Sequence, residues 1–124
     1  MRVTLGLFDV PHDQAIYFYC DVLGLFAVKV DELSPSGERI VVMDHIDPTA
    51  SFSILVRSGT ILNDDLRSQR PRFWLELQHR DMTAVLERLQ RSNSRCEVQP
   101  LPFGNACAAL DPFGNIVRLT DEVY

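Results

Sequence analysis

The chain has 124 residues, 46% of them hydrophobic, a size that favours two half-domains sharing one core over two independent domains. Its formal net charge is −5, with acidic and basic residues interspersed, which argues against a nucleic-acid binder and against an anionic-membrane binder. No run reaches the roughly twenty apolar residues of a membrane span, and three cysteines without metal-type spacing or a recognisable signal peptide predict reduced thiols in a cytoplasm.

The first half of the chain begins with a predicted strand and an amphipathic helix. Residues 3–8 are expected to form the strand, and residues 13–23 carry apolar side chains at the spacings of a helix. The side chains on this helix face are Ala15, Phe18, Tyr19, Val22 and Leu23. Asp13 is the predicted N-terminal cap, and Gly24 stands where a helix commonly ends in a left-handed residue.

A β-hairpin is predicted after this helix. Its strands are expected at residues 39–43 and 52–56, and the turn signal between them is Asp47-Pro48. The next segment, residues 58–70, is polar and shows no steady periodicity. It is therefore expected to be a linker or a lid, with room for a short helical turn at 62–66.

The second half begins in the same way as the first. Residues 72–77 are predicted to form a strand, and residues 81–89 an amphipathic helix with Asp81 as its cap. The apolar face of this helix consists of Met82, Val85, Leu86 and Leu89. Each half thus opens with a strand followed by a helix.

A second hairpin completes the repeat. Strands are predicted at residues 106–110 and 116–120 around a turn that begins with Asp111-Pro112, and this turn lies 64 residues after Asp47-Pro48. We therefore predict two modules, each ordered strand, helix, strand, strand, strand. Together they would form one domain, 1–124, with modules 1–57 and 71–124 joined by the linker 58–70.

Two motifs resemble a known superfamily. The helix sequence at 15–25 (AIYFYCDVLGL), followed by the Asp111-Pro112-x-Gly114-Asn115 hairpin, resembles the vicinal oxygen chelate superfamily. This superfamily includes glyoxalase I, bleomycin-resistance proteins and extradiol dioxygenases. The resemblance implies an α+β fold in which two βαβββ modules form a curved sheet around a cleft. It also implies a homodimer, because small members usually form one.

The positions of the family's metal ligands can be tested one by one. In metal-dependent members, His, Glu or Gln ligands come from the first and last strands of each half, and the last strand follows the pattern Gly-Asn-x-x-Glu-Leu. Here Arg118 occupies the glutamate position, and internal alignment of the two hairpins places Ile54 opposite Arg118. Arginine stays protonated and offers no lone pair to a cation. We therefore expect no metal and no cofactor.

The opening strands supply no ligand either. Period-two alternation directs Arg72, Trp74 and Glu76 into the cleft from the second half. Arg2, Thr4, Gly6 and Phe8 would face the cleft from the first half. The three histidines, His12, His45 and His79, lie near element ends and are expected at the surface.

These residues suggest a pocket for a small molecule. Arginine forks at Arg72 and Arg118, with Arg2 as a third candidate, bind carboxylate or phosphate by paired hydrogen bonds. In the alternative, Arg118 pairs with Glu76 and merely satisfies a polar interior. Aromatic side chains would supply apolar walls. The full set of predicted ligand-binding residues is Arg72, Arg118, Trp74, Glu76, Phe8, Thr4, Phe52 and Ile54.

The leading hypothesis is a metal-independent protein, similar to glyoxalase and bleomycin-resistance proteins, that binds a small anionic or aromatic organic molecule. Catalysis is not favoured, because no nucleophile–base pair is visible and Glu76 is the one cleft candidate for proton transfer. The first alternative is a metal-dependent lyase, epimerase or dioxygenase of the same superfamily. The second is a non-catalytic module that binds a partner protein.

Overall fold

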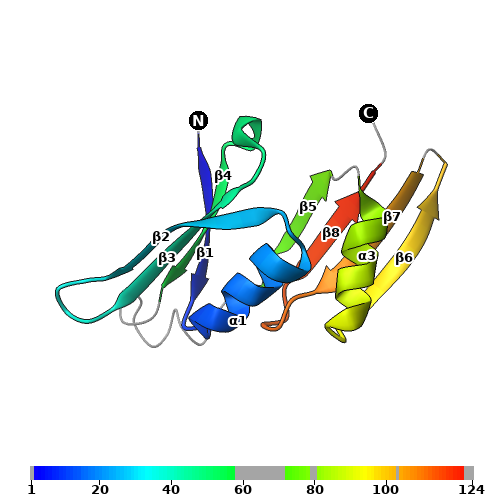
Figure 1. Cartoon of the computed structure of the whole chain (residues 1–124). Coiled ribbons are helices and arrows are strands. Elements are labelled where there is room, and N and C mark those ends of the chain that lie inside the picture. The colour runs from blue at the N-terminus through cyan, green and yellow to red at the C-terminus, as the bar shows by residue number, and fades with distance from the viewer. Residues whose placement is uncertain (1, 58–71, 79–80, 103, 122–124) are drawn as a thin grey trace. The chain divides into compact units, whose positions relative to one another are not determined.

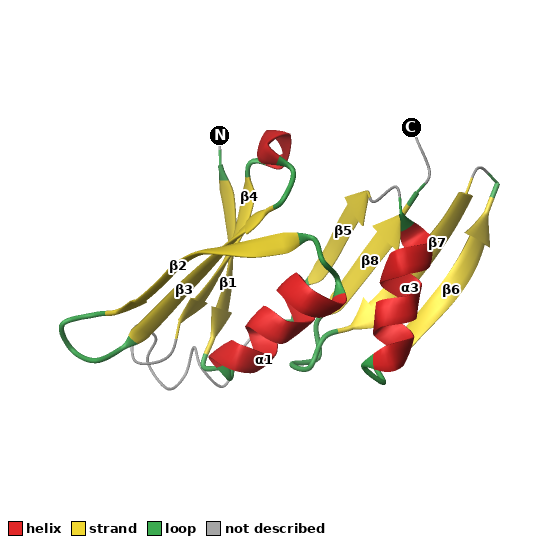
Figure 2. Ribbon diagram, viewed as in Figure 1, coloured by secondary structure: helices red, strands yellow, loops and turns green. Residues whose placement is uncertain are grey.

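A computed structural model describes residues 2–57, 72–78, 81–102 and 104–121. The chain divides into two compact units, residues 1–70 and 71–124, and each unit carries its own four-stranded sheet with helical segments (Figures 1 and 2). The predicted linker 58–70 lies outside the described residues. No helix in the described ranges has the length and apolar character of a membrane span.

Unit 1 is a βαβββ module. In chain order it contains β1 (Val3–Phe8), α1 (His12–Ile16), η1 (Tyr17–Val22), β2 (Phe26–Leu33), β3 (Arg39–His45), the short 3-10 turn η2 (Pro48–Ala50) and β4 (Phe52–Arg57). The sheet order is β1-β4-β3-β2, with β1 parallel to β4 and the other pairs antiparallel. The first predicted module is therefore confirmed.

The first helical segment begins and ends one residue earlier than predicted and changes its geometry halfway. It begins at His12 as an α-helix and continues as a π-helical turn over Tyr17–Val22, in which the Leu23 amide donates to the Phe18 carbonyl at 2.9 Å. Pro11 occupies the cap position without a side-chain bond, so the predicted cap at Asp13 is wrong. Gly24 has a φ of +69°, as its place after the helix predicted.

The core of unit 1 lies between this helix and one face of the sheet. All five apolar side chains predicted for the helix face are buried, as are apolar residues of β1, β3 and β4. Ile54 belongs to this buried face and is 0% exposed. The prediction that Ile54 faces a cleft is therefore wrong: its neighbours Ser53 and Leu55 occupy the opposite face of β4, where both border a groove.

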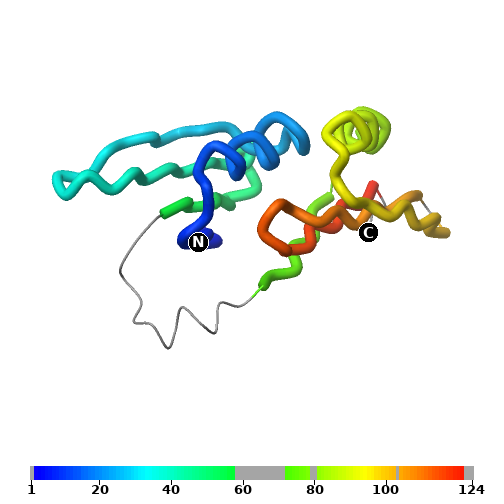
Figure 3. The backbone as a smooth tube through the Cα atoms, turned by 90° about the horizontal axis from the view of Figure 1, so that it is seen from below, coloured from blue at the N-terminus to red at the C-terminus, as the bar shows by residue number. Residues whose placement is uncertain are grey.

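Unit 2 repeats the βαβββ order. It contains β5 (Trp74–Gln78), α3 (Met82–Arg91), β6 (Cys96–Leu101), β7 (Gly104–Leu110) and β8 (Ile116–Thr120), in the sheet order β5-β8-β7-β6. Helix α3, seen nearly end-on in Figure 3, covers one face of this sheet. Its cap is confirmed, because the Asp81 Oδ1 atom accepts from the Ala84 amide at 3.2 Å. Met82, Val85 and Leu89 are buried, whereas Leu86 is half-buried.

The Asp111–Asn115 turn is a buried hydrogen-bonded unit. Asp111 and Asn115 are 3% and 5% exposed. The Asp111 Oδ1 atom accepts from the amides of Phe113 at 2.9 Å and Asn115 at 2.7 Å, and Asn115 Nδ2 donates to Asp111 Oδ2 at 2.9 Å. Asn115 Oδ1 in turn accepts from the Phe73 amide at 3.0 Å. The turn motif therefore joins the start of β8 to the start of β5.

Candidate functional site

The open face of the unit 2 sheet, opposite α3, carries a cluster of three predicted site residues. The strand pairing sets Glu76 of β5 beside Arg118 of β8. The Arg118 Nη1 atom lies 3.3 Å from Glu76 Oε1, with the two side chains 17% and 51% exposed. The indole Nε1 of Trp74 donates to the same oxygen at 3.3 Å. Two donors therefore converge on one carboxylate oxygen, and Trp74 itself remains 60% exposed.

This arrangement realises the internal pairing that the sequence left as an alternative. Glu76 compensates the charge of Arg118 within the unit, so the guanidinium does not stand alone on the sheet. The Glu76 carboxylate accepts both hydrogen bonds, from Trp74 and from Arg118. Next to the pair, a groove of about 490 Å³ is lined by Arg118, by Ala106 and Ala108 of β7, and by residues 97–100 of β6.

Arg72 does not join this cluster. Its side chain lies over the Asp111–Asn115 turn, where a Cβ placed on Gly114 would approach the Arg72 Nε atom to 3.2 Å. Glu76, which binds Arg118, is four residues further along the chain, about 13 Å of extended strand. The predicted pairing of arginine forks at Arg72 and Arg118 is therefore not formed within unit 2, because Arg118 bonds to Glu76 and Arg72 lies beside Gly114.

The open face of the unit 1 sheet is polar. The Thr4 and Ser53 hydroxyl oxygens lie 3.1 Å apart, and Ser53 is only 1% exposed. Arg2 forms an ion pair with Asp44. Phe8 covers Gly6, because a Cβ built on Gly6 would lie 2.6 Å from the Phe8 ring. A groove of about 470 Å³ on this face is lined by Arg2, Thr4, Lys29, Val30, Val42, Asp44, Ser53 and Leu55.

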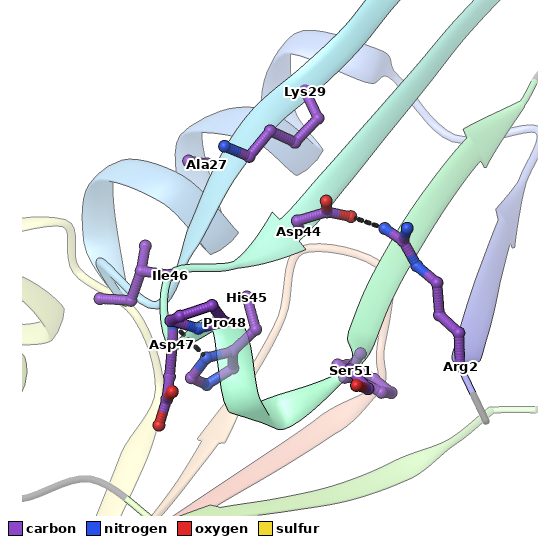
Figure 4. Close-up of a pocket in the computed structure, with 10 residues that line it drawn as sticks. Arg2, Ala27, Lys29, Asp44, His45, Ile46, Asp47, Pro48 and Ser51 are labelled. Carbon is purple, nitrogen blue, oxygen red and sulfur yellow. Dashed lines mark hydrogen bonds and ion pairs between the residues drawn. The ribbon is translucent and has the colours of Figure 1, made fainter.

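A larger pocket of about 700 Å³ adjoins this groove in unit 1 (Figure 4). It lies at the β3–β4 connection and beside β2, and its lining residues are Arg2, Ala27, Lys29, Asp44, His45, Ile46, Asp47, Pro48, Ser51 and Phe52. Of the predicted ligand-binding residues, Phe52 borders the pocket and Thr4 borders the groove. Sequence reasoning assigned none of Lys29, Asp44 and Asp47 to a site: the first two carry no recognisable motif, and Asp47 was interpreted only as part of a turn.

Two of the three histidines are more integrated than predicted. His45 ends β3 and lines the pocket, where its Nδ1 atom accepts from the Asp47 amide at 3.0 Å. Its ring meets Phe26 edge-on at a centroid distance of 5.5 Å. His12 begins α1, and its Nε2 atom is 2.8 Å from the Arg39 carbonyl. Their predicted places at element ends are confirmed, but both are half-buried, and His79 lies outside the described residues.

The described residues do not fit the metal that the fold family implies. Within the described ranges, no three His, Cys, Asp or Glu side chains gather in a group that could hold an ion. Arg118 and Glu76 bond to each other, and Ile54 is in the core. The described residues therefore supply no set of ligands for a metal ion.

Two of the three cysteines, Cys20 and Cys107, are poor candidates for a nucleophile. Burial raises the pKa of the Cys107 thiol to about 12, and its neighbour Cys96 adds to the shift. Burial, followed by the charge of Asp21, raises the pKa of Cys20 to about 11. The thiolate is the reactive form. Both thiols therefore remain protonated near neutral pH.

Comparisons with known proteins agree on the fold. No family model and no curated protein matches the chain. A glyoxalase/bleomycin resistance protein from Streptomyces sp. CB03234 is similar with a TM-score of 0.71 and 20% identity, covering 97% of this chain and 99% of that chain. TnmS3, an antibiotic binding protein from the same organism, gives a TM-score of 0.72 and 20% identity over 97% and 93% of the two chains.

A third similar structure is a mutant of FosX, a fosfomycin resistance protein from Listeria monocytogenes, complexed with Mn(II) and 1S,2S-dihydroxypropylphosphonic acid. It has a TM-score of 0.66 and 11% identity over 97% of this chain and 90% of that chain. At such identities the likeness defines the fold and leaves the activity open. This chain has the two-module fold of the vicinal oxygen chelate superfamily, as its helix and turn motifs predicted.

Proposed function

We propose that this protein is a metal-independent binding protein of the glyoxalase/bleomycin resistance type, which holds a small aromatic organic molecule. The observation that carries the proposal is the cluster of Trp74, Glu76 and Arg118 on the open face of unit 2. Glu76 fixes one edge of the exposed indole, which leaves a ring face for stacking. Arg118 keeps further N–H groups beyond its bond to Glu76, and these suit an acidic group on the ligand.

TnmS3, a protein of similar fold, is an antibiotic binding protein, which supports the binding of a small organic molecule as the function. Two features argue against the metal-dependent lyase, epimerase or dioxygenase. Arginine at position 118 cannot donate a lone pair, and the described residues bring no three donor side chains together. Glu76 is the remaining candidate for proton transfer, and it already accepts two hydrogen bonds.

One observation favours the second alternative, a non-catalytic module for a partner protein. Arg118 and Glu76 neutralise each other, as expected for a polar surface that needs no charged ligand. The two functions differ in what Arg118 does. A small-molecule site needs this guanidinium for affinity, whereas a partner-binding surface would use a broader area around Trp74.

We also propose a homodimer and a cytoplasmic location. Two of the four edge strands of the described sheets, β2 and β6, carry exposed apolar side chains, Leu33 and Val98, which would gain from association with a second chain. The three cysteines are free thiols, which suits a reducing compartment. Light scattering coupled to size exclusion would measure the mass, and a monomer at 100 μM would contradict the dimer.

The proposed function is tested by the fluorescence of Trp74, the single tryptophan of the chain. We expect 2-naphthoate to change this fluorescence with saturation and Arg118→Met to weaken the binding about tenfold, as for one charge-assisted hydrogen bond. Arg91→Met, an exposed change at the end of α3, is the matched control. The metal content is measured on the same sample. Stoichiometric metal, or ligand binding that EDTA abolishes, would contradict the proposal of a metal-independent protein.

A further inference from the structure

We infer that the pocket at the β3–β4 connection of unit 1 is a binding site for a small aromatic carboxylate, with Lys29 as the residue that selects the charge. This site is lined only by unit 1 residues. It is built from strands other than those that carry Trp74, Glu76 and Arg118, so the inference goes beyond the proposed function. Four observations carry it: the position of Lys29, the charges around it, the nature of the walls, and the size of the pocket.

Lys29 owes its position to a β-bulge. The register between β2 and β3 pairs Val28 with Met43 and then Val30 with Val42, so that Lys29 has no residue opposite. Ala27 and Lys29 line the pocket, and Val30 lines the adjoining groove beside Lys29. The bulge therefore brings the side chains of two consecutive residues to the same face of the sheet, one of them charged.

No described residue of the pocket lining pairs with the Lys29 ammonium group: the two aspartates of the lining, Asp44 and Asp47, bond to other residues. Asp44, which lines the pocket, forms an ion pair with Arg2. The Asp47 Oδ1 atom accepts from the amide of Thr49 at 3.0 Å and from its hydroxyl at 2.8 Å, and Figure 4 shows the carboxylate well away from the Lys29 amine. Within the part of the chain that the structure describes, the Lys29 side chain forms no ion pair or hydrogen bond.

The pocket also offers a neutral donor and apolar walls. Because the His45 Nδ1 atom accepts from the Asp47 amide, the neutral ring carries its proton on Nε2 and donates from there. Phe52 packs against Phe26 at 5.9 Å, which holds its ring in place. Ile46 and Pro48 add further apolar side chains to the pocket wall.

The chemistry of the ligand follows from this inventory. An ammonium group that forms no ion pair matches a carboxylate, and the apolar wall matches a ring. A volume of about 700 Å³ lies within the usual range for small-molecule pockets, about 300–1,000 Å³. A cationic ring would meet Lys29 unfavourably, and a neutral ring would leave the ammonium without a partner.

The test uses the full chain with benzoate, benzamide and benzamidinium, three probes of the same shape that differ in charge. Binding is followed by calorimetry and by the backbone amide signals of the chain in NMR spectra. We expect benzoate to bind at least about tenfold more tightly than benzamide. Benzoate should shift the amide signals of residues 27–30 and 44–47, and added salt should weaken its binding.

Lys29→Met is expected to reduce benzoate affinity about tenfold, and Lys29→Arg to retain it. Arg91→Met is the matched control, because it removes an exposed cation outside both proposed sites and should leave benzoate binding at this pocket intact. Equal affinities for benzoate and benzamide would overturn the inference, as would an unchanged Lys29→Met variant.

The outcomes separate this inference from the proposed function. If Arg118→Met abolishes binding and Lys29→Met does not, the inference fails and the proposed function stands. If benzoate shifts residues 27–30 while 2-naphthoate leaves Trp74 fluorescence unchanged, the inference stands and the proposed function fails. Should Lys29→Met not fold, the NMR map of the unaltered chain decides, since shifts confined to unit 2, or none at 10 mM benzoate, would overturn the site.

Discussion

The side-chain oxygen of Asn115 accepts a hydrogen bond from the backbone amide of Phe73, 42 residues earlier in the chain, at 3.0 Å. This bond places the start of β8 against the start of β5 and continues in the pair between the Ile116 amide and the Phe73 carbonyl. The register that sets Glu76 beside Arg118 begins at this point. The turn therefore has a structural role, and it positions the candidate site indirectly.

Asn115→Ala should destabilise the protein by about 2–3 kcal/mol, because it removes bonds to Phe73 and Asp111 and leaves buried polar atoms unpaired. Urea unfolding followed by circular dichroism measures the change. Gln90→Ala, on the exposed side of α3, serves as the control and should stay within about 0.5 kcal/mol of the unaltered chain. An equally small effect of Asn115→Ala would show that the turn does not hold the two strands together.

Two glycines with similar backbone angles separate conformational strain from side-chain contact. Gly114 and Gly37 have φ values of +91° and +86°, where other residues are strained. A Cβ on Gly114 would press against Arg72, whereas nothing lies within 4 Å of one on Gly37. Gly37→Ala should cost about 1 kcal/mol, and Gly114→Ala should cost more.

The same pair tests the position of Arg72. The Gly114→Ala change can also be made in the Arg72→Ala background. If Arg72 lies over the turn, Gly114→Ala should then lower the free energy of unfolding only about as much as Gly37→Ala does in the unaltered chain. Thermal unfolding of the unaltered chain and these variants provides the comparison. If Gly114→Ala destabilises the Arg72→Ala variant as much as it destabilises the unaltered chain, the new methyl group does not clash with Arg72.

Ile54 and Leu55 test the assignment of faces on β4. Ile54→Ala removes a fully buried side chain and should destabilise the chain by about 2–4 kcal/mol. Leu55→Ala, on the open face, should cost less because that side chain is half-buried. Chemical unfolding of both variants gives the two values. A reversed order would return Ile54 to the open face that the sequence alignment proposed.

Asp31 makes stability depend on pH. Its hydrogen bond and charge interaction with Arg39 lower the pKa of the carboxyl below its ordinary value. A carboxyl with a lowered folded-state pKa contributes stability above its unfolded-state pKa of about 3.9 and loses it as the pH falls through the folded-state value. Asp31→Asn should therefore be less stable than the unaltered chain at pH 7, and this difference should vanish as the pH falls below about 4.

The Arg39→Met background provides the control for this pH effect. There, Asp31→Asn should have little effect at any pH, because the partner that lowers the pKa is absent. Arg39→Met also removes the ion pair with Asp13, but this loss occurs both with and without Asp31→Asn and therefore cancels in the comparison. If the Asp31→Asn variant stayed less stable than the unaltered chain at low pH, the effect would belong to something other than the ion pair.

Local pattern was sufficient for much of the fold. The spacing of apolar residues identified both helix faces, and Asp81 and Gly24 were correctly assigned because a cap and a left-handed end depend on adjacent residues. Alternation placed Trp74 and Glu76 on one face of β5, and the Arg118–Glu76 pair was foreseen as an alternative. Such features rest on periods of about 2 and 3.6 residues, which a sequence displays directly.

Features that depend on how strands meet were not predictable in this way. Ile54 and Arg118 each stand seven residues after the aspartate of their turns, yet Ile54 is buried and Arg118 is on an open face. The β3–β4 connection contains a 3-10 turn and a left-handed Ser51, unlike the tight turn at Asp111. A shift of one residue between the connections reverses every side chain of the following strand.

The pocket of unit 1 was equally hidden. The bulge that directs Lys29 into this pocket arises from the pairing of β2 with β3. Asp44 does not pair with Lys29, because it forms an ion pair with Arg2 instead. The amino-acid sequence by itself determined the elements, their order and the two-module fold, because these depend on local periodicity and turn chemistry. Only the tertiary structure decided which charges are compensated and which faces stay open, because those depend on residues far apart in the chain.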